Sequence, residues 1–177
     1  MLLLNMINAA RLNKNYYQKI ALDIESTTKA FMIVILMSIA ASMGIFRPTT
    51  LSELFGSIII TILLWMLWVF IVYNLSNLFL RKAEQVRSWG SLFRTLGVAQ
   101  SPGALHMIGA FISPELIAIG DSISYFLVWI IIGWQISCSL YGIYSLIEES
   151  YSIKTAAGIT FGSYIPFVAI ILLLTRI

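Results

Sequence analysis

The chain has 177 residues, of which 59% are hydrophobic and 11% charged, and its formal net charge is +3. An average soluble domain is about a quarter charged, and a soluble core of this size could not bury so much apolar surface. The composition therefore excludes a soluble globular protein, and the small net charge argues for membrane topology rather than nucleic-acid binding.

The charged residues lie in short clusters separated by five charge-free stretches of 17 to 27 residues. A helix needs about 20 apolar residues to cross the hydrocarbon core of a bilayer. The fold predicted is an all-α integral membrane protein, a five-span helical bundle after an amphipathic interfacial helix. The spans are expected near residues 30–46, 55–80, 95–113, 122–147 and 155–175.

Residues 1–29 are predicted to form the amphipathic helix, and residues 30–177 the transmembrane domain. At 100° per residue the apolar side chains share about a third of the helical wheel, and Arg11, Lys14 and Lys19 lie opposite them. Such a helix lies in the headgroup plane, or packs its apolar face on the bundle. The apolar face consists of Leu2, Met6, Ala9, Tyr16, Tyr17, Ile20 and Ile24.

The loop after the second span holds four basic residues, Arg81, Lys82, Arg87 and Arg94, with Trp89 between them. Tryptophan together with basic residues is typical of a membrane–water interface. We expect these side chains, with those of the amino-terminal helix, to bind anionic lipid headgroups. The distribution of Lys and Arg over the loops predicts a cytoplasmic amino terminus.

The third predicted span is charge-free but contains residues that interrupt helices. Pro102 lacks a backbone donor, and Gly103 does not resist bending. We expect either a broken span whose freed backbone groups are satisfied inside the bundle, or a re-entrant hairpin. Gln100, Ser101 and His106 are expected to line its interior and to offer a cavity there.

The fourth and fifth spans contain two small-residue features. Cys138 is the only cysteine, so neither an intrachain disulfide nor a thiolate metal site can form, and a packing role is expected. Gly158 and Gly162 have the G-x-x-x-G spacing that lets helices approach closely. Packing within the chain is favoured over dimerisation for these two glycines.

The sequence contains few groups suited to catalysis. It has no P-loop, H-E-x-x-H, C-x-x-C or G-x-S-x-G motif, and no charged residue in the middle of a clear span. His106 is the only histidine, so metal sites built on histidine clusters are excluded. We expect it to be a polar residue bonded within the bundle, with porphyrin-metal ligation or proton handling as alternatives. No enzymatic activity, metal or cofactor is expected.

The most specific stretch is residues 93–103, Phe-Arg-Thr-Leu-Gly-Val-Ala-Gln-Ser-Pro-Gly, which resembles a segment of bacterial members of the Yip (Ypt-interacting protein) family. A second similarity begins at Trp129, at the start of a long span that ends near Glu148. The pattern Ser-x-Lys-x-Ala follows from Ser152. Together these features resemble the family over about residues 54–162.

The resemblance implies a five-span bundle with a cytoplasmic amino end. The chain departs from the family pattern at Tyr144, where an arginine is expected, and at Lys154, which replaces an arginine. No role of the first arginine is therefore carried over. Eukaryotic relatives associate with Rab-type GTPases, whereas this chain resembles the bacterial branch, so that function is not transferred.

We therefore expect a non-enzymatic protein of the bacterial cytoplasmic (inner) membrane that acts by interaction. It would be an accessory or scaffolding subunit of a larger membrane complex, or would act in membrane organisation. The expected partners are membrane lipids with anionic headgroups and other integral membrane proteins, not nucleic acid. The alternative is a small channel or transporter whose site lies at the broken third segment, because interrupted helices often line substrate sites.

Overall fold

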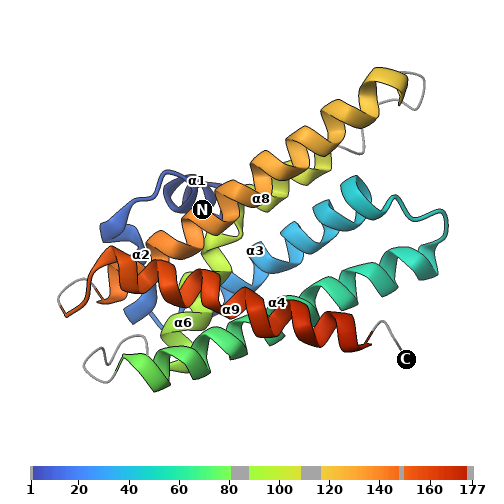
Figure 1. Cartoon of the computed structure of the whole chain (residues 1–177). Coiled ribbons are helices and arrows are strands. Elements are labelled where there is room, and N and C mark those ends of the chain that lie inside the picture. Colours follow the sequence, from blue (N-terminus) through green and yellow to red (C-terminus); the bar gives the residue numbers. More distant parts are fainter. Residues whose placement is uncertain (1, 81–87, 109–116, 148–149, 175–177) are drawn as a thin grey trace.

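The computed structural model describes residues 2–80, 88–108, 117–147 and 150–174. Every regular element within these ranges is helical (Figure 1). In chain order they are α1 (Leu2–Ala10), α2 (Lys14–Leu22), α3 (Ser26–Ala41), the π-helical turn η1 (Ser42–Phe46), α4 (Leu51–Phe79), α6 (Trp89–Ala99), the 3₁₀-helix η2 (Ser101–Met107), α8 (Ile117–Ile147) and α9 (Ile153–Leu174).

Four of the described helices are long and apolar enough to cross a membrane. They are α3 extended by η1 (Ser26–Phe46), α4 (Leu51–Phe79), part of α8 (Phe126–Ile147) and part of α9 (Ile153–Ile170). These coincide with the first, second, fourth and fifth predicted spans. The protein is therefore an all-helical membrane protein with four candidate membrane-spanning helices in the described part of the chain.

The start of α4 shows how a polar corner begins a long apolar helix. Thr50 is the N-cap, and its hydroxyl accepts a hydrogen bond from the Glu53 backbone N–H at 3.3 Å. The Glu53 carboxylate accepts in return from the Thr49 backbone N–H at 2.8 Å. One amide that the helix leaves unpaired and the amide of the residue before the cap are thereby satisfied, which fixes the turn between α3 and α4.

The long helices run back and forth between the two ends of the molecule (Figure 1). α1 and α2 lie at the end where α4 finishes, α6 begins and α8 finishes. The turn between α3 and α4, the start of α8 and the end of α9 lie at the opposite end. α6 and η2 lie inside the bundle, in contact with both α3 and α8.

The amino-terminal segment differs from the single amphipathic helix that the sequence predicts. It forms two short helices, because Leu12 adopts a left-handed backbone conformation with φ of 56° between them. α2 then begins afresh, with the Asn13 side chain accepting from the Tyr16 backbone N–H at 3.2 Å. A helical wheel cannot detect this break, because the apolar period continues across it.

The apolar face of these two helices packs on the bundle, which was the alternative to an interfacial helix. Ala9, Tyr17 and Ile20 are fully or nearly buried in a cluster with residues of α3, α6 and α8, including Cys138. The Tyr17 hydroxyl donates to the Ala9 carbonyl at 3.0 Å and joins α1 to α2. Ile24, which was expected on the same face, is 77% exposed instead.

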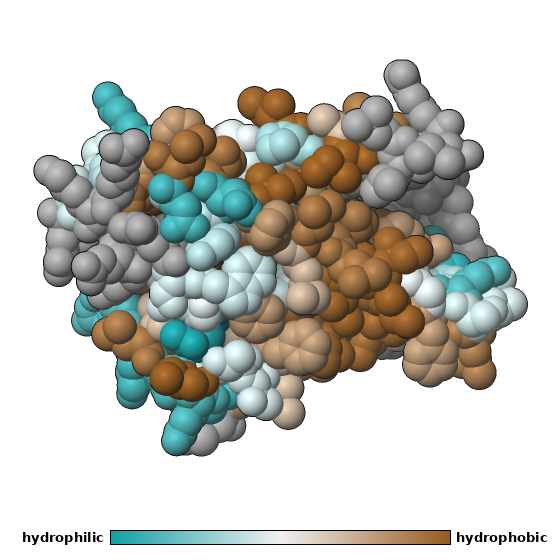
Figure 2. Space-filling view, turned by 90° about the horizontal axis from the view of Figure 1, so that it is seen from below, coloured by the Kyte–Doolittle hydropathy of each residue, from teal (hydrophilic) through white to brown (hydrophobic). Residues whose placement is uncertain are grey.

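The main hydrophobic core joins α4, α6, α8 and α9. Trp68 of α4 is buried in it, and its indole N–H donates to the Ser163 hydroxyl of α9 at 2.9 Å. Outside this core the long helices present apolar side chains to their surroundings. Figure 2 shows hydrophobic residues over the middle of the molecule and hydrophilic residues toward its two ends, the pattern of a protein surrounded by lipid.

The glycines that allow close helix packing are not those that the G-x-x-x-G spacing indicated. A Cβ placed on Gly158 or Gly162 would meet no other described atom within 4 Å. Close packing of these residues within the described chain is therefore absent, and the two line a groove with Leu75 and Phe79 of α4. By contrast, a Cβ on Gly97 would lie 3.0 Å from the Ala30 Cβ, so this glycine brings α6 against α3.

Candidate functional site

The break in the third segment lies where the sequence predicts it. α6 ends at Ala99, and the chain continues beyond Gln100 as the 3₁₀-helix η2, with Pro102 in its first turn. The Gly103 N–H donates to the Gln100 carbonyl at 2.8 Å, and the Ser101 hydroxyl donates to the Val98 carbonyl at 2.5 Å. Backbone carbonyls freed by the break are thus satisfied within the chain.

Two glycines let the broken segment lie directly against its neighbours. A Cβ on Gly103 would come within 2.3 Å of Met37 Cγ and 2.4 Å of Gln135 Nε2. A Cβ on Gly44 would come within 1.7 Å of the His106 carbonyl oxygen. A larger residue at either position would overlap its neighbours. Glycine is therefore required at both positions for η2 to contact α3, η1 and α8 this closely.

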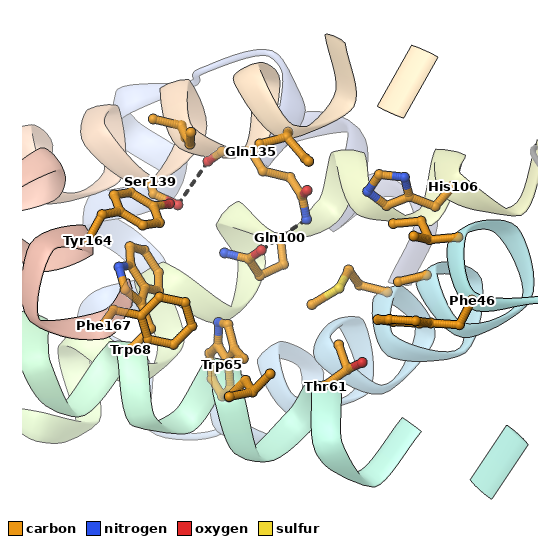
Figure 3. Close-up of a pocket in the computed structure, with 16 residues that line it drawn as sticks. Phe46, Thr61, Trp65, Trp68, Gln100, His106, Gln135, Ser139, Tyr164 and Phe167 are labelled. Carbon is orange, nitrogen blue, oxygen red and sulfur yellow. Dashed lines mark hydrogen bonds between the residues drawn. The ribbon is translucent and has the colours of Figure 1, made fainter. Parts of the chain in front are cut away.

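A partly open cavity of about 280 Å³ lies beside the break, between α3, α4, α8 and α9 (Figure 3). Its lining is predominantly apolar, and none of the described residues that form it is charged. The polar and aromatic lining residues are Thr61, Trp65 and Trp68 of α4, Gln100 and His106 of the broken segment, Gln135 and Ser139 of α8, Tyr164 and Phe167 of α9, and Phe46 of η1.

Amide groups from two elements are joined across the cavity (Figure 3). Gln135 Nε2 donates to Gln100 Oε1 at 3.0 Å, which ties α8 to the break. Ser139 donates its hydroxyl proton to the Gln135 backbone carbonyl at 2.8 Å, within α8. The cavity therefore has one polar wall, formed by the broken segment and the facing turn of α8.

Two buried ring nitrogens have no partner among the described residues: Trp65 Nε1 and His106 Nδ1. Trp65 is 5% exposed and His106 is 4% exposed. The indole nitrogen of Trp65 points into the cavity (Figure 3), whereas that of the neighbouring Trp68 is paired with Ser163. Leaving a buried donor unpaired costs about 1–3 kcal/mol, so such groups usually meet a ligand or an ordered water.

Comparison with known proteins does not add to this description. No family model matches the chain, and no curated protein or solved structure is significantly similar to it. The resemblance to the Yip family therefore rests on the sequence motif alone. In the structure most of that motif is buried, from Arg94 to Gly103, and it forms the contacts of α6 and η2 with the rest of the bundle.

The structure brings together only some of the residues predicted for the broken segment. Gln100 and His106 line the cavity, whereas Ser101, Pro102 and Gly103 are buried beside it without lining it. The prediction missed the aromatic residues of α4 and α9, which lie within the predicted spans 55–80 and 155–175. Thr61, Leu64, Trp65 and Trp68 do repeat at helical spacing, and this stripe was the available signal.

Arg94 does not have the headgroup role expected of it. It is 7% exposed, and its guanidinium donates to the carbonyls of Ile20, at 3.1 Å, and Ala21. These carbonyls belong to the last turn of α2, where a helix leaves acceptors unpaired. Arg94 therefore fixes α2 to α6, and a buried guanidinium held in this way is not available to a lipid phosphate.

The other predicted headgroup residues are divided between described and undescribed parts of the chain. Arg11, Lys14 and Lys19 are exposed on and beside α1 and α2. Arg81, Lys82 and Arg87 lie outside the described residues. No group of His, Cys, Asp and Glu in the described ranges is arranged to hold a metal ion.

Proposed function

We propose that the chain is a five-span protein of the bacterial cytoplasmic membrane, with its amino end in the cytoplasm. α6 and η2 have 11 and 7 residues, and at about 1.5 and 2.0 Å per residue they cover roughly 30 Å, the thickness of a hydrocarbon core. They lead from the end that holds α1 and α2 toward the end where α8 begins. Lys154, at the start of α9, then shares the cytoplasmic end with Arg11, Lys14 and Lys19, as the positive-inside rule requires.

For its activity, we propose non-enzymatic binding of a small, neutral, largely apolar molecule in the cavity beside the break. The observation that carries this proposal is the buried indole N–H of Trp65, which points into an apolar cavity and has no partner in the described chain. An apolar pocket with a few convergent polar groups is the usual form of a small-molecule site.

This proposal develops the alternative expectation from the sequence, a site at the broken third segment. It does not develop the expectation of a protein that acts only as a scaffold. A water-filled channel would need a continuous polar path, whereas this lining is mostly aromatic and aliphatic. Interrupted helices near the middle of a membrane often form binding sites, because their free backbone and side-chain groups face a cavity instead of lipid.

Native mass spectrometry of the purified chain in nanodiscs tests the binding site. Ala41 lines the cavity, whereas Ala169 of α9 is exposed on the outer surface, so Ala41→Phe and Ala169→Phe are matched variants. We expect a small-molecule adduct on the wild type and on Ala169→Phe, and its loss from Ala41→Phe. No adduct on the wild type, or an adduct unchanged by Ala41→Phe, would overturn the proposal. Size-exclusion profiles and melting temperatures verify that both variants are folded.

A second candidate function is supported by the outward face of α8. Phe126 and Trp129 are 65% and 70% exposed there, and large aromatic residues are common anchors of protein interfaces. An accessory subunit would use this face to contact another integral membrane protein. We expect a defined partner to co-purify with the wild type in mild detergent and to be lost from Trp129→Ala. Equal recovery of partners by both proteins would argue against this face.

A further inference from the structure

We propose that the molecule bound in the cavity is of the quinone type: a neutral planar ring that presents carbonyl oxygens and no hydroxyl groups. This inference rests on the proposed small-molecule site and specifies its ligand. Three properties of the cavity carry it: the hydrogen-bonding groups that remain unused, the absence of charge, and the aromatic walls.

The unused polar groups of the cavity include two hydrogen-bond donors, beside His106 Nδ1, which donates or accepts according to its tautomer. Gln100 Oε1 already accepts from Gln135, so the acceptor of this amide is engaged inside the protein. The amide nitrogen of Gln100 donates to the Leu96 carbonyl at 3.5 Å, a long bond that engages only one of its two N–H groups. The indole N–H of Trp65 can only donate and has no partner in the described chain. A complementary ligand therefore brings an acceptor to these donors.

Two of the hydroxyl groups in the lining have already given their protons to backbone carbonyls. Thr61 donates to the Ser57 carbonyl at 2.8 Å, and Ser139 donates to the Gln135 carbonyl at 2.8 Å. A ligand with its own hydroxyl groups would have to compete for the lone pairs that remain. A carbonyl oxygen needs only the two N–H groups that are available.

The ligand must be neutral, because none of the described lining residues is charged. A buried ion without a counter-charge is strongly unfavourable. A fatty-acid carboxylate or a phosphate would meet no cation inside this cavity. An amine would meet no carboxylate.

The walls suit a flat ring. Trp68 and Tyr164 are stacked, with ring centroids 5.6 Å apart and planes 25° apart. Phe167 packs edge-on against Tyr164 at 6.5 Å. Aromatic rings prefer such offset-stacked and edge-to-face neighbours, and a planar conjugated ligand can continue the same arrangement.

The size of the cavity and its connection to the surface match a ring with a hydrophobic tail. A volume of about 280 Å³ lies just below the range of about 300–1,000 Å³ that is typical for drug-sized ligands. It therefore holds a ring-sized head but not a whole lipid. Ile45 and Phe46 line the cavity and are also 41% and 60% exposed, so an attached tail can leave past them toward lipid.

Binding of three related rings to the full chain in nanodiscs tests the assignment by isothermal titration calorimetry against empty nanodiscs. The three are a short-tailed benzoquinone, its hydroquinone kept reduced, and the same ring without oxygens. We expect the quinone to bind about tenfold more tightly than either of the others, since one hydrogen bond contributes roughly this factor. Equal affinities for quinone and hydrocarbon, or tighter binding of the hydroquinone, would overturn the proposal.

Two tryptophan variants locate the interaction. Trp65→Phe keeps an aromatic ring but removes the N–H, and Trp129→Phe makes the same change on the outer face of α8, where Trp129 is 70% exposed. We expect about tenfold weaker quinone binding by Trp65→Phe and wild-type binding by Trp129→Phe. Equal affinities for the two variants would contradict the role of Trp65. If Trp65→Phe does not fold, the affinities of the three rings for the wild type still decide whether the cavity prefers a quinone.

Ester carbonyls of membrane phospholipids are the other source of a neutral acceptor. Nanodiscs made with ether-linked lipids lack them, so a quinone affinity that is the same in ester and ether lipids supports the assignment. A higher affinity in ether lipids would mean that lipid esters occupy the site, and would overturn it. An adduct that Ala41→Phe removes but that a quinone cannot displace would refute the quinone alone and leave the small-molecule site standing.

Discussion

At the scale of single residues, the buried guanidinium of Arg94 holds two helices together through hydrogen bonds. Its guanidinium pairs with the last carbonyls of α2, and its Nη1 also reaches the Thr27 hydroxyl at 3.4 Å. We expect Arg94→Met to lower the free energy of unfolding by about 1–3 kcal/mol, because buried carbonyls lose their donors. The melting temperature in detergent measures this loss. Arg11→Met, at an exposed position, should melt like the wild type, and equal melting of both variants would contradict the role of Arg94.

Asp23 gives a residue-scale prediction about pH. Hydrogen bonds from the Ser26 hydroxyl and then from the Glu25 backbone N–H lower the pKa of its carboxyl group in the folded protein. Its contribution to stability is therefore present above the unfolded pKa of about 3.9 and is lost as the pH falls through the lower folded pKa. We expect Asp23→Asn to weaken the fall in melting temperature as the pH drops below about 4. An unchanged acid dependence would contradict this.

At the scale of elements, the contact of η2 with its neighbours depends on Gly103. In Gly103→Ala the new methyl group would overlap Met37 and the Gln135 amide. We expect destabilisation of about 1–3 kcal/mol, the usual effect of overpacking, and a weaker bond between Gln135 and Gln100. Thermal melting and ligand affinity measure the two effects. Gly133→Ala is the control, because a Cβ there meets no other described atom within 4 Å.

The elements that could be predicted are those with a local signal. Pro102 and Gly103 mark the break, and charge-free stretches mark the four long helices, because both depend on a few consecutive residues. The cavity could not be predicted, since Trp65 and Gln135 face each other only after distant helices pack. Arg94 was misassigned for the same reason: its partner is a helix end about 70 residues earlier, as its bonds to Ile20 and Ala21 show.

At the scale of the whole molecule, the five-span proposal fixes on which side each loop lies. In a chain with Cys138→Ser, we expect a membrane-impermeant maleimide added outside to label Ala118→Cys but not Tyr151→Cys. If the third segment does not cross, the two outcomes are exchanged. Thr49→Cys, in the turn between α3 and α4, should be labelled in either case and serves as the control.

The contacts of α1 and α2 with α8 also determine when these two helices can pack into the bundle during synthesis of the chain. The Trp134 indole donates to the Ala10 carbonyl at 2.9 Å, and Gln18 Nε2 donates to the Ser145 carbonyl at 3.1 Å, across 124 and 127 positions of sequence. At about 5–20 residues per second, a ribosome needs roughly 6–25 s to make that intervening chain. Throughout this interval the apolar faces of α1 and α2 have no α8 to cover them. α1 and α2 can therefore reach their final place only after α8 has been made, although their partners in α8 lie 124 and 127 positions later in the chain.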